Sequence, residues 1–237
     1  VNLRKDLDVS VDNSLSYTDE YVRGKEFDEF NFKQVSTRTV KRIISNLTNT
    51  GALGNDGIGT KVLKRWKHVI APPLRHIVNM SIFFGEYPRA WKLGTITPLP
   101  KGGNPKEMKN WRPICINPAS SKVLETVLNE QISYHMESQK LYSETQHAYR
   151  KERSVTSALI ELDTMCREQL NKGKIVGVLT TDVSAGFNLV SKEILIPKMA
   201  RFGFRQEARE LLGDYLTGRQ TKVKIKNVLS DPVSLET

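Results

Sequence analysis

Apolar residues recur with a helical period over most of the chain. After Ser36, the residues Val40, Ile43, Ile44 and Leu47 have the spacing of one helix face, which is typical of an amphipathic helix with a buried side. Pro72-Pro73 should interrupt the pattern, because proline removes a backbone donor. We therefore predict helices over about 37–49, 59–69, 73–85, 121–137, 154–171, 191–202 and 206–217.

The helix predicted at about 154–171 has clear end signals. Ser154 suits an N-cap and Gly173 suits the C-terminal cap. Its apolar residues share one face, which we expect to point inward. These residues are Ala158, Leu159, Leu162, Met165 and Leu170.

Alternating and continuous apolar runs predict a few strands. A short alternating strand lies within 91–101, and the apolar run after Gly173 predicts a strand over 174–182 that ends at Asp182. In the tail, Val223 and Ile225 alternate with lysines, which predicts a hairpin over about 219–236. Residues 1–35 are polar, and we interpret them as an extended connector. The order of the predicted elements as a whole indicates a mixed chain of helices with few strands.

Composition adds a preference for polyanions. The 237 residues include 36 Lys and Arg and 26 Asp and Glu, a net charge of +10, which favours nucleic acid or an anionic surface as partner. Cys115 and Cys166 are far apart and are expected to be reduced thiols, with no zinc-ligand spacing. No apolar run has the length of a membrane span and no signal peptide opens the chain, so we expect a nuclear or cytoplasmic protein without a membrane partner.

Asp182 is a candidate metal ligand. A carboxylate at the end of a buried strand is held in place, and the carbonyl of Val183 can add a second hard oxygen. Phe187 follows where the chain turns toward a helix, and its flat ring could lie against a sugar. The alternatives are a turn-forming Asp and ordinary core packing for the Phe.

Lys101 and Arg112 flank a polar turn after the strand in 91–101. Across a hairpin-like turn, Arg could bind a triphosphate bidentately and Lys could bind it as a point charge. The alternative is a solvated basic loop.

The residues just before the N-cap at Ser154 include Gln146, Tyr149 and Arg150. Such polar, aromatic and basic groups suit a strand of nucleic acid. The alternative is an ordinary loop that leads into a helix.

Five ordered segments over about 36–237 resemble the reverse transcriptase of non-LTR (LINE-type, jockey/CR1-like) retrotransposons. The fourth segment resembles that family's motif A, and the fifth the approach to its motif B. The segments are NDGIGTKVLK, ITPLPKGGNPKEMKNWRPICINPASSKVLE, QHAYRKERSV, LTTDVSAGFNLV and YLTGRQTKVKI.

This resemblance implies an α+β right-hand polymerase fold, with fingers, a partial palm and an incomplete antiparallel palm sheet. It implies a reaction that uses two Mg²⁺ ions, an RNA template, a DNA primer or target, and dNTPs. The implied organisation is an N-terminal connector at 1–35, fingers at 36–173, the first part of the palm at 174–218, and a hairpin leading toward motif B at 219–237.

The resemblance also assigns roles to single residues. Asp182 matches the first catalytic aspartate and Val183 a backbone metal ligand. Phe187 matches the gate that rejects a ribose 2′-hydroxyl. Lys101 and Arg112 match the triphosphate grip, and Gln146 and Arg150 lie along the template.

Two residues depart from the family pattern, since Ala148 stands where the family usually has Gly and Asn188 where it usually has Asp. Motif B and the Asp-Asp motif are expected after Thr237, so we expect these 237 residues alone to be inactive. The alternatives are a decayed or co-opted fragment that acts as a basic nucleic-acid-binding module, and a group II intron-type maturase.

Overall fold

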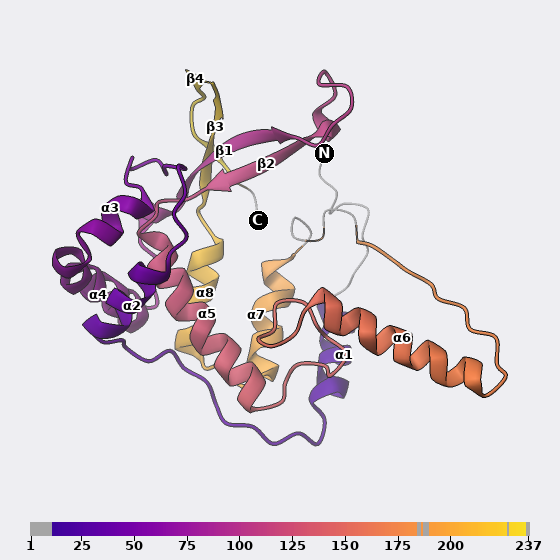
Figure 1. Cartoon of the computed structure of the whole chain (residues 1–237). Helices are drawn as coiled ribbons and strands as arrows, with labels where there is room; N and C mark the ends of the chain where they lie inside the picture. The colour runs from indigo at the N-terminus through magenta and orange to yellow at the C-terminus, as the bar shows by residue number, and fades with distance from the viewer. Residues whose placement is uncertain (1–10, 184–185, 187–189, 227, 236–237) are drawn as a thin grey trace. The chain divides into compact units, whose positions relative to one another are not determined.

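The computed structural model describes residues 11–183, 186, 190–226 and 228–235 of the chain (Figure 1). These residues belong to two compact units, each of which is described by itself. The larger unit comprises residues 10–131 and 191–237, and the smaller unit comprises residues 1–9 and 132–190.

The larger unit contains six α-helices and the first part of a seventh within its described residues. The positions of α5, α7 and α8 agree with the ranges that the apolar period predicts. The helices are α1 (Val11–Val22), α2 (Thr37–Asn46), α3 (Thr60–Arg65), α4 (Lys67–Phe84), α7 (Lys192–Arg201), α8 (Gln206–Leu216) and, through residue 131, the first part of α5 (Ser121–Ser138).

The apolar face of α2 lies in the core of the larger unit. Ser36 caps the helix, since its hydroxyl accepts a hydrogen bond from the Thr39 N–H at 3.1 Å. Val40, Ile43 and Ile44 are buried, and α2 packs against α4. Burial of side chains of this size stabilises the fold by about 1.5–3 kcal/mol each, so the period that predicts this helix also identifies its buried residues.

The two predicted helices are present as α3 and α4, but the boundary between them lies at Trp66 and not at the prolines, which corrects the predicted division. Pro72 and Pro73 lie inside α4, which is continuous from Lys67. Each proline lacks a backbone donor, but the neighbouring residues Ala71 and Leu74 are buried in the core. Packing of this face offsets the missing hydrogen bonds.

The prediction that residues 1–35 are wholly extended is also wrong, because α1 is helical. It packs against α7, and Arg201 Nε lies 3.0 Å from Asp19 Oδ1. Further along, Phe30 is buried and its ring lies 4.7 Å from that of Phe204. These contacts join residues far apart in the chain, so local polarity could not indicate them.

The sheet of the larger unit is mixed. β1 pairs with β2 in antiparallel fashion and with β3 in parallel fashion, in the order β2-β1-β3-β4, and β5 pairs with β3. The strands are β1 (Leu93–Pro100), β2 (Trp111–Ile116), β3 (Gln220–Ile225), β4 (Val228–Leu229) and β5 (Val233–Ser234).

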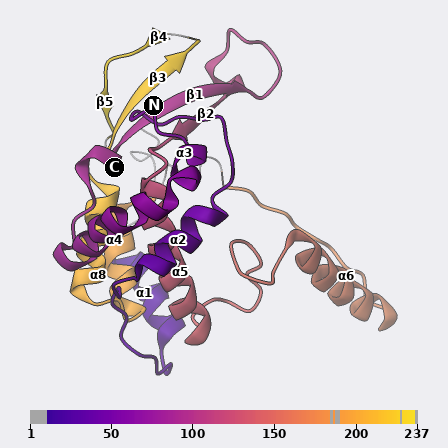
Figure 2. The ribbon, with the colours of Figure 1, turned by 60° about the vertical axis from the view of Figure 1, so that its left-hand side comes forward.

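Both predicted features of this sheet, the strand within 91–101 and the pairing within the tail, are confirmed. The parallel β1–β3 pair is new, and it makes the sheet mixed where an antiparallel one was expected. The two views agree that the sheet lies at one end of α2, α4 and α8 and that the β1–β2 hairpin extends away from them (Figures 1 and 2). The chain therefore combines helices with a partial mixed sheet, as an α+β assignment requires.

The strand predicted at 174–182 is not formed. Residues 174–183 have no strand pairing with the described part of the chain, and Figure 1 shows them as an extended trace. The side chain of Ile175 is 100% exposed and that of Leu179 is 90% exposed. A strand needs a neighbour for its N–H and C=O groups, and no strand pairing is formed by these residues within the described part of the smaller unit.

Helix α6 (Val155–Asn171) of the smaller unit begins and ends where the sequence predicts. Ser154 and Ser157 form a reciprocal capping box, and Gly173 follows the helix with φ of 73°. The predicted inward face is wrong, because no residue of α6 is buried. The period gives the helix correctly, but it does not say whether another element covers the apolar side. The large exposed residues of that face are Leu159, Leu162, Met165 and Leu170.

Among the helices in the described ranges, none combines the length and the apolar character that crossing a membrane requires.

Candidate functional site

The pairing of β1 with β2 places Lys101 and Arg112 on one face of the hairpin. Leu99 lies opposite Arg112, and the Lys101 N–H donates to the Asn110 carbonyl at 2.7 Å, which continues the ladder. Side chains alternate along a strand, so Leu99 and Lys101 share the face of Arg112. Diagonal neighbours on such a pair lie about 7–8 Å apart, which lets both cations reach one anionic ligand.

Lys101 and Arg112 differ in the hydrogen bonds that their side chains make within the protein. Lys101 Nζ donates to the Lys109 carbonyl at 3.0 Å, which uses one of its three donors. Arg112 is exposed, and its guanidinium makes no hydrogen bond or ion pair with the residues that the structure describes. A planar guanidinium and a nearby ammonium can together bind a phosphate group.

The turn between the two strands is ordered by its own side chains. Trp111 Nε1 donates to the Pro105 carbonyl at 2.9 Å, and Asn110 Nδ2 donates to the Asn104 carbonyl at 2.9 Å. Gly102 has a positive φ of 104°, a conformation that residues with a side chain rarely adopt. The backbone at both cations is therefore fixed by bonds on each side of the turn.

An ion pair between buried Lys92 and half-buried Asp214 anchors the beginning of β1, and no sequence pattern indicates it. Lys92 is 9% exposed, and its Nζ lies 2.7 Å from Asp214 Oδ1 in α8. The same carboxylate accepts the Tyr87 N–H at 2.6 Å. Lys92 and Asp214 are far apart in the sequence, so no short-range spacing could connect them. The pair ties the base of the hairpin to the helical core.

The Tyr87 side chain completes this anchor. Its hydroxyl donates to Glu125 Oε1 at 2.9 Å, and Ser121 Oγ donates to the same oxygen at 3.1 Å. Burial, together with the negative charge of Glu125, raises the pKa of the Tyr87 phenol far above its usual value. The phenol therefore stays neutral and acts as a hydrogen-bond donor.

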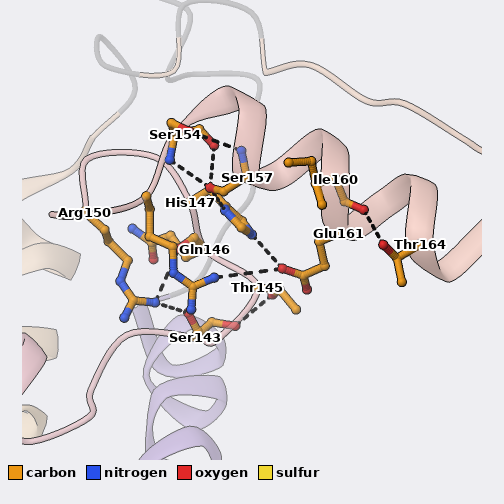
Figure 3. Close-up of polar contacts among 11 residues, drawn as sticks. Ser143, Thr145, Gln146, His147, Arg150, Ser154, Ser157, Ile160, Glu161 and Thr164 are labelled. Carbon is orange, nitrogen blue, oxygen red and sulfur yellow. Dashed lines mark hydrogen bonds and ion pairs between the residues drawn. The ribbon is translucent and has the colours of Figure 1, made fainter.

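In the smaller unit, Arg150 holds the predicted nucleic-acid-binding loop together. Its Nε and Nη2 lie 2.9 and 2.8 Å from the two carboxylate oxygens of Glu137. Its Nη1 donates to the Ser143 carbonyl at 2.8 Å and to the Gln146 carbonyl at 3.3 Å (Figure 3). The guanidinium lowers the pKa of the Glu137 carboxyl through these hydrogen bonds. Arg150 is thus engaged within the loop.

His147 provides the second fixed point of this loop and was not among the predicted residues. Its Nδ1 lies 2.7 Å from Ser157 Oγ, and its Nε2 lies 2.8 Å from Glu161 Oε2, both in α6 (Figure 3). Arg153 Nη1 lies 3.9 Å from the same carboxylate. The sequence does place Ser157 and Glu161 one turn apart on one face of a helix. It does not show that the preceding loop folds back and brings His147 to that face.

The loop displays Gln146 and Tyr149 outward. Tyr149 is 86% exposed and has a positive φ of 58°, and Gln146 is exposed with its amide donating to the Ala148 carbonyl at 3.3 Å. The structure thus brings the three predicted residues Gln146, Tyr149 and Arg150 into one loop, two facing solvent and one turned inward.

Asp182 and Val183 lie in the unpaired segment of the smaller unit. Both are exposed, and the Asp182 carboxylate makes no hydrogen bond or ion pair with any residue that the structure describes. Phe187 and Asn188 lie outside the described residues. Within the described ranges, no group of three or more His, Cys, Asp or Glu could hold a metal ion. Two hard oxygens, the Asp182 carboxylate and the Val183 carbonyl, are present for a cation to use.

Comparison with known proteins gives a consistent result. Residues 99–231, more than half of the chain, match the sequence model of the family described as reverse transcriptase (RNA-dependent DNA polymerase). This match includes both strands of the hairpin from Leu99 onward, the loop at 143–153 and Asp182.

Individual relatives are retrotransposon proteins. The chain is 25% identical over 174 residues to the retrovirus-related Pol polyprotein from type-1 retrotransposable element R2 of Popillia japonica, covering 73% of this chain and 23% of that protein. It is 26% identical over 198 residues to the probable RNA-directed DNA polymerase from transposon X-element of Drosophila melanogaster, covering 81% and 21%. For the RNA-directed DNA polymerase from mobile element jockey of the same fly, the identity is 24% over 169 residues, covering 70% and 18%. The chain spans about a fifth of the length of these relatives.

Proposed function

This chain belongs to the reverse transcriptase (RNA-dependent DNA polymerase) family, and we propose that it forms part of a non-LTR retrotransposon enzyme that copies RNA into DNA. The observation that carries the proposal is the hairpin within the matched region, whose register aligns Lys101 and Arg112 on one face. The relatives carry retrotransposon polymerase names, which does not favour a group II intron-type maturase or a non-enzymatic binding module.

Within such an enzyme, the chain supplies the fingers and the beginning of the palm of a right-hand polymerase. We assign residues 36–173 to the fingers, 174–218 to the first part of the palm and 219–237 to a hairpin that leads toward motif B, with 1–35 as a connector. The β1–β3 pairing supports a close relation between the tail hairpin and the fingers strands.

Lys101 and Arg112 bind the triphosphate of the incoming dNTP in this proposal. The exposed guanidinium of Arg112 offers a bidentate fork, and the Lys101 ammonium adds a point charge beside it. Phe187, outside the described residues, is proposed as the side chain that rejects a ribose 2′-hydroxyl.

Asp182 is proposed as a catalytic metal ligand, with the Val183 carbonyl as a second oxygen. Both are ligands that Mg²⁺ prefers, and two bound ions would activate the primer 3′-hydroxyl and stabilise the leaving pyrophosphate. The Asp182 carboxylate is solvent-exposed and makes no hydrogen bond or ion pair with the described residues, so both of its oxygens can coordinate a metal ion. One carboxylate cannot complete two near-octahedral sites, so we propose that residues 1–237 alone extend no primer.

The loop at 143–153 contributes to the path of the RNA template. Gln146 and Tyr149 face solvent, where an amide and an aromatic ring can contact and stack on nucleotides. Arg150 supports them from within, because its bonds to Glu137 and to two loop carbonyls fix the backbone that presents them.

Primer extension on an RNA template tests the proposal, in a protein that contains this chain together with the remaining metal carboxylates. Arg112→Ala should raise the KM for dNTP about tenfold or more with a smaller change in kcat, because a charged hydrogen bond contributes about 1.5–3 kcal/mol. Arg38→Ala, which removes another exposed arginine of the larger unit, should leave the KM unchanged. Equal KM values for Arg112→Ala and the unaltered protein would refute the assigned nucleotide grip.

A further inference from the structure

The strands of the sheet carry positive charge without any negative charge. Across β1 to β5 there is no Asp or Glu, and the basic residues of the strands are Arg112, Lys222 and Lys224. A charge distribution of this kind favours an anion on the sheet surface. The position of each basic side chain relative to the two faces decides whether the charges can act together.

The register puts all of these charges on the same face. In the parallel β1–β3 pair, Lys222 lies beside Thr95, so the two side chains share a face, and Lys224 follows two residues later on that face. Thr95 shares its face with Leu99 and Lys101, and Leu99 lies opposite Arg112. We call Lys101, Arg112, Lys222 and Lys224 the cationic face.

The opposite face of the same strands is largely apolar. Ile96 lies beside Val223, and Ile225 follows on that side with 60% of its surface exposed. Alternation along β3 therefore separates lysine from aliphatic residues. Because the two faces differ in chemistry, a polyanion is expected on one of them only.

Nothing described in the protein neutralises the lysines of β3. Lys222 is half-buried and Lys224 is exposed, and neither side chain makes an ion pair or hydrogen bond with the residues that the structure describes. Other cations of this unit are engaged by carboxylates, such as Lys92 by Asp214 and Arg205 by Glu29. The ammonium groups of Lys222 and Lys224 are therefore available to an anion from outside the described residues.

The length of the cationic face suits a chain of phosphates. From the level of Thr95 to Lys101 is six residues of β1, about 20 Å at a rise of about 3.3 Å per residue. A nucleic-acid strand in a duplex carries a phosphate about every 3.4 Å, so several successive phosphates fit along this distance. Lys222 lies at one end of this distance and Lys101 at the other, and Lys224 and Arg112 lie between them.

We propose that Lys222 and Lys224 bind the phosphodiester backbone of a single-stranded RNA that crosses the sheet from β3 toward the β1–β2 hairpin. This inference rests on the proposed function, because it places a template strand beside the incoming nucleotide, as templated pairing requires. The lysines act by charge and not by reading bases, so binding shows little sequence preference.

Salt-dependent binding tests this inference directly. The anisotropy of a fluorescent oligo(U) 20-mer, titrated with the purified protein between 50 and 200 mM salt, gives the slope of log K against log salt. Each single-strand phosphate contact contributes about 0.7 to that slope, so Lys222→Ala/Lys224→Ala should reduce it by about 1.4. An oligo(dT) 20-mer of equal length shows whether the contact depends on the sugar, and we expect a similar loss there because the contacts are to phosphate.

Two further variants separate position from net charge. Lys33→Ala/Arg38→Ala removes two exposed cations of the same unit, outside the sheet, and should leave the slope nearly unchanged. Lys222→Val combined with Val223→Lys moves one ammonium to the opposite face at constant composition, and it should lose about 0.7 of the slope. Circular dichroism and thermal unfolding establish that each variant is folded. If the double variant does not fold, the single variant Lys224→Gln, at an exposed position, replaces it in the binding experiment.

The inference is overturned if the β3 variants keep the full slope, or if the control pair loses as much as the β3 pair. These results are independent of catalysis. A protein that extends primers while its β3 variants keep the slope contradicts the inference alone. In a protein that also contains the remaining metal carboxylates, loss of the slope on β3 substitution without any primer extension retains the binding face and contradicts the proposed polymerase.

Discussion

Two apolar segments of similar pattern have opposite fates in this protein. β1 of the larger unit is hydrogen-bonded on both sides, by β2 and by β3, and Thr95 near its beginning is 6% exposed. Residues 174–183 of the smaller unit are as apolar, yet they have no strand neighbour in the described chain. An apolar run therefore specifies the tendency to be buried, and the neighbours decide whether a strand forms.

The same contrast holds for helices. α2 and α6 both have a helical period and a serine N-cap. Val40 and Ile44 of α2 are fully buried, whereas Leu159 and Met165 of α6 are 60% and 59% exposed. Capping and periodicity define each helix, but only α2 gains the stability of a packed face.

The largest expected difference is in amide hydrogen exchange. Amides of α2 and β1 should open only with the global unfolding of their unit, which at about 5 kcal/mol corresponds to a protection of more than 1,000-fold. Residues 174–183 should exchange near the rate of an unprotected chain. Hydrogen-exchange mass spectrometry measures both in one sample. Equal protection of the two segments would contradict the difference in strand pairing between them.

Two matched Leu→Ala substitutions, one at a buried and one at an exposed position, should show the next largest difference, which is in the free energy of unfolding. Leu124→Ala removes a fully buried side chain of α5 and should lower the free energy of unfolding by about 2–5 kcal/mol. Leu159→Ala makes the same chemical change on the exposed face of α6 and should alter it by less than about 0.5 kcal/mol. Urea unfolding curves measure both. A large loss at Leu159 would mean that α6 is covered in solution.

The smallest effect concerns the loop at 143–153 and its dependence on pH. The pKa of Glu137 is lowered by Arg150, so the pair's contribution is full above the unfolded pKa of about 4.3 and is lost as pH falls through the lower folded value. We expect exchange at the loop to accelerate below about pH 4. Glu137→Gln should give faster exchange already at pH 6 and remove the acid step.

His147 provides an internal check on that experiment. Its imidazole faces Ser157 and Glu161, with Arg153 near the same carboxylate. The variant His147→Gln has no imidazole, so an acid step that persists in it does not come from His147 and is assigned to Glu137. If the acid step disappears in His147→Gln, the step depends on His147, and its assignment to Glu137 is wrong.

Sequence reasoning recovered what local pattern controls. The N-cap at Ser154, the strand before Lys101 and the alternation around Val223 are properties of neighbouring residues, and each is confirmed. The placement of Lys101 and Arg112 on one face also follows from a short hairpin.

What sequence reasoning missed depends on contacts between distant residues. The parallel β1–β3 pair, the Lys92–Asp214 anchor and the packing of α1 on α7 each join segments more than 100 residues apart, and no local period indicates such pairs. The predicted strand before Asp182 fails for the complementary reason, since its pattern is right but no described segment pairs with it. The role of Arg150 was read from its charge, and only the structure shows that Glu137 and two carbonyls engage it.

The most direct measurement of the central claim is template-dependent primer extension with Asp182→Asn, in a protein that contains this chain and the remaining metal carboxylates. Asp182→Asn keeps the size of the side chain and removes the charge that would hold the metal ions. The account predicts that the rate falls by several orders of magnitude, while Asp231→Asn, at another exposed aspartate of the chain, keeps the rate of the unaltered protein. A near-normal rate for Asp182→Asn would contradict the assignment of Asp182 as a catalytic metal ligand.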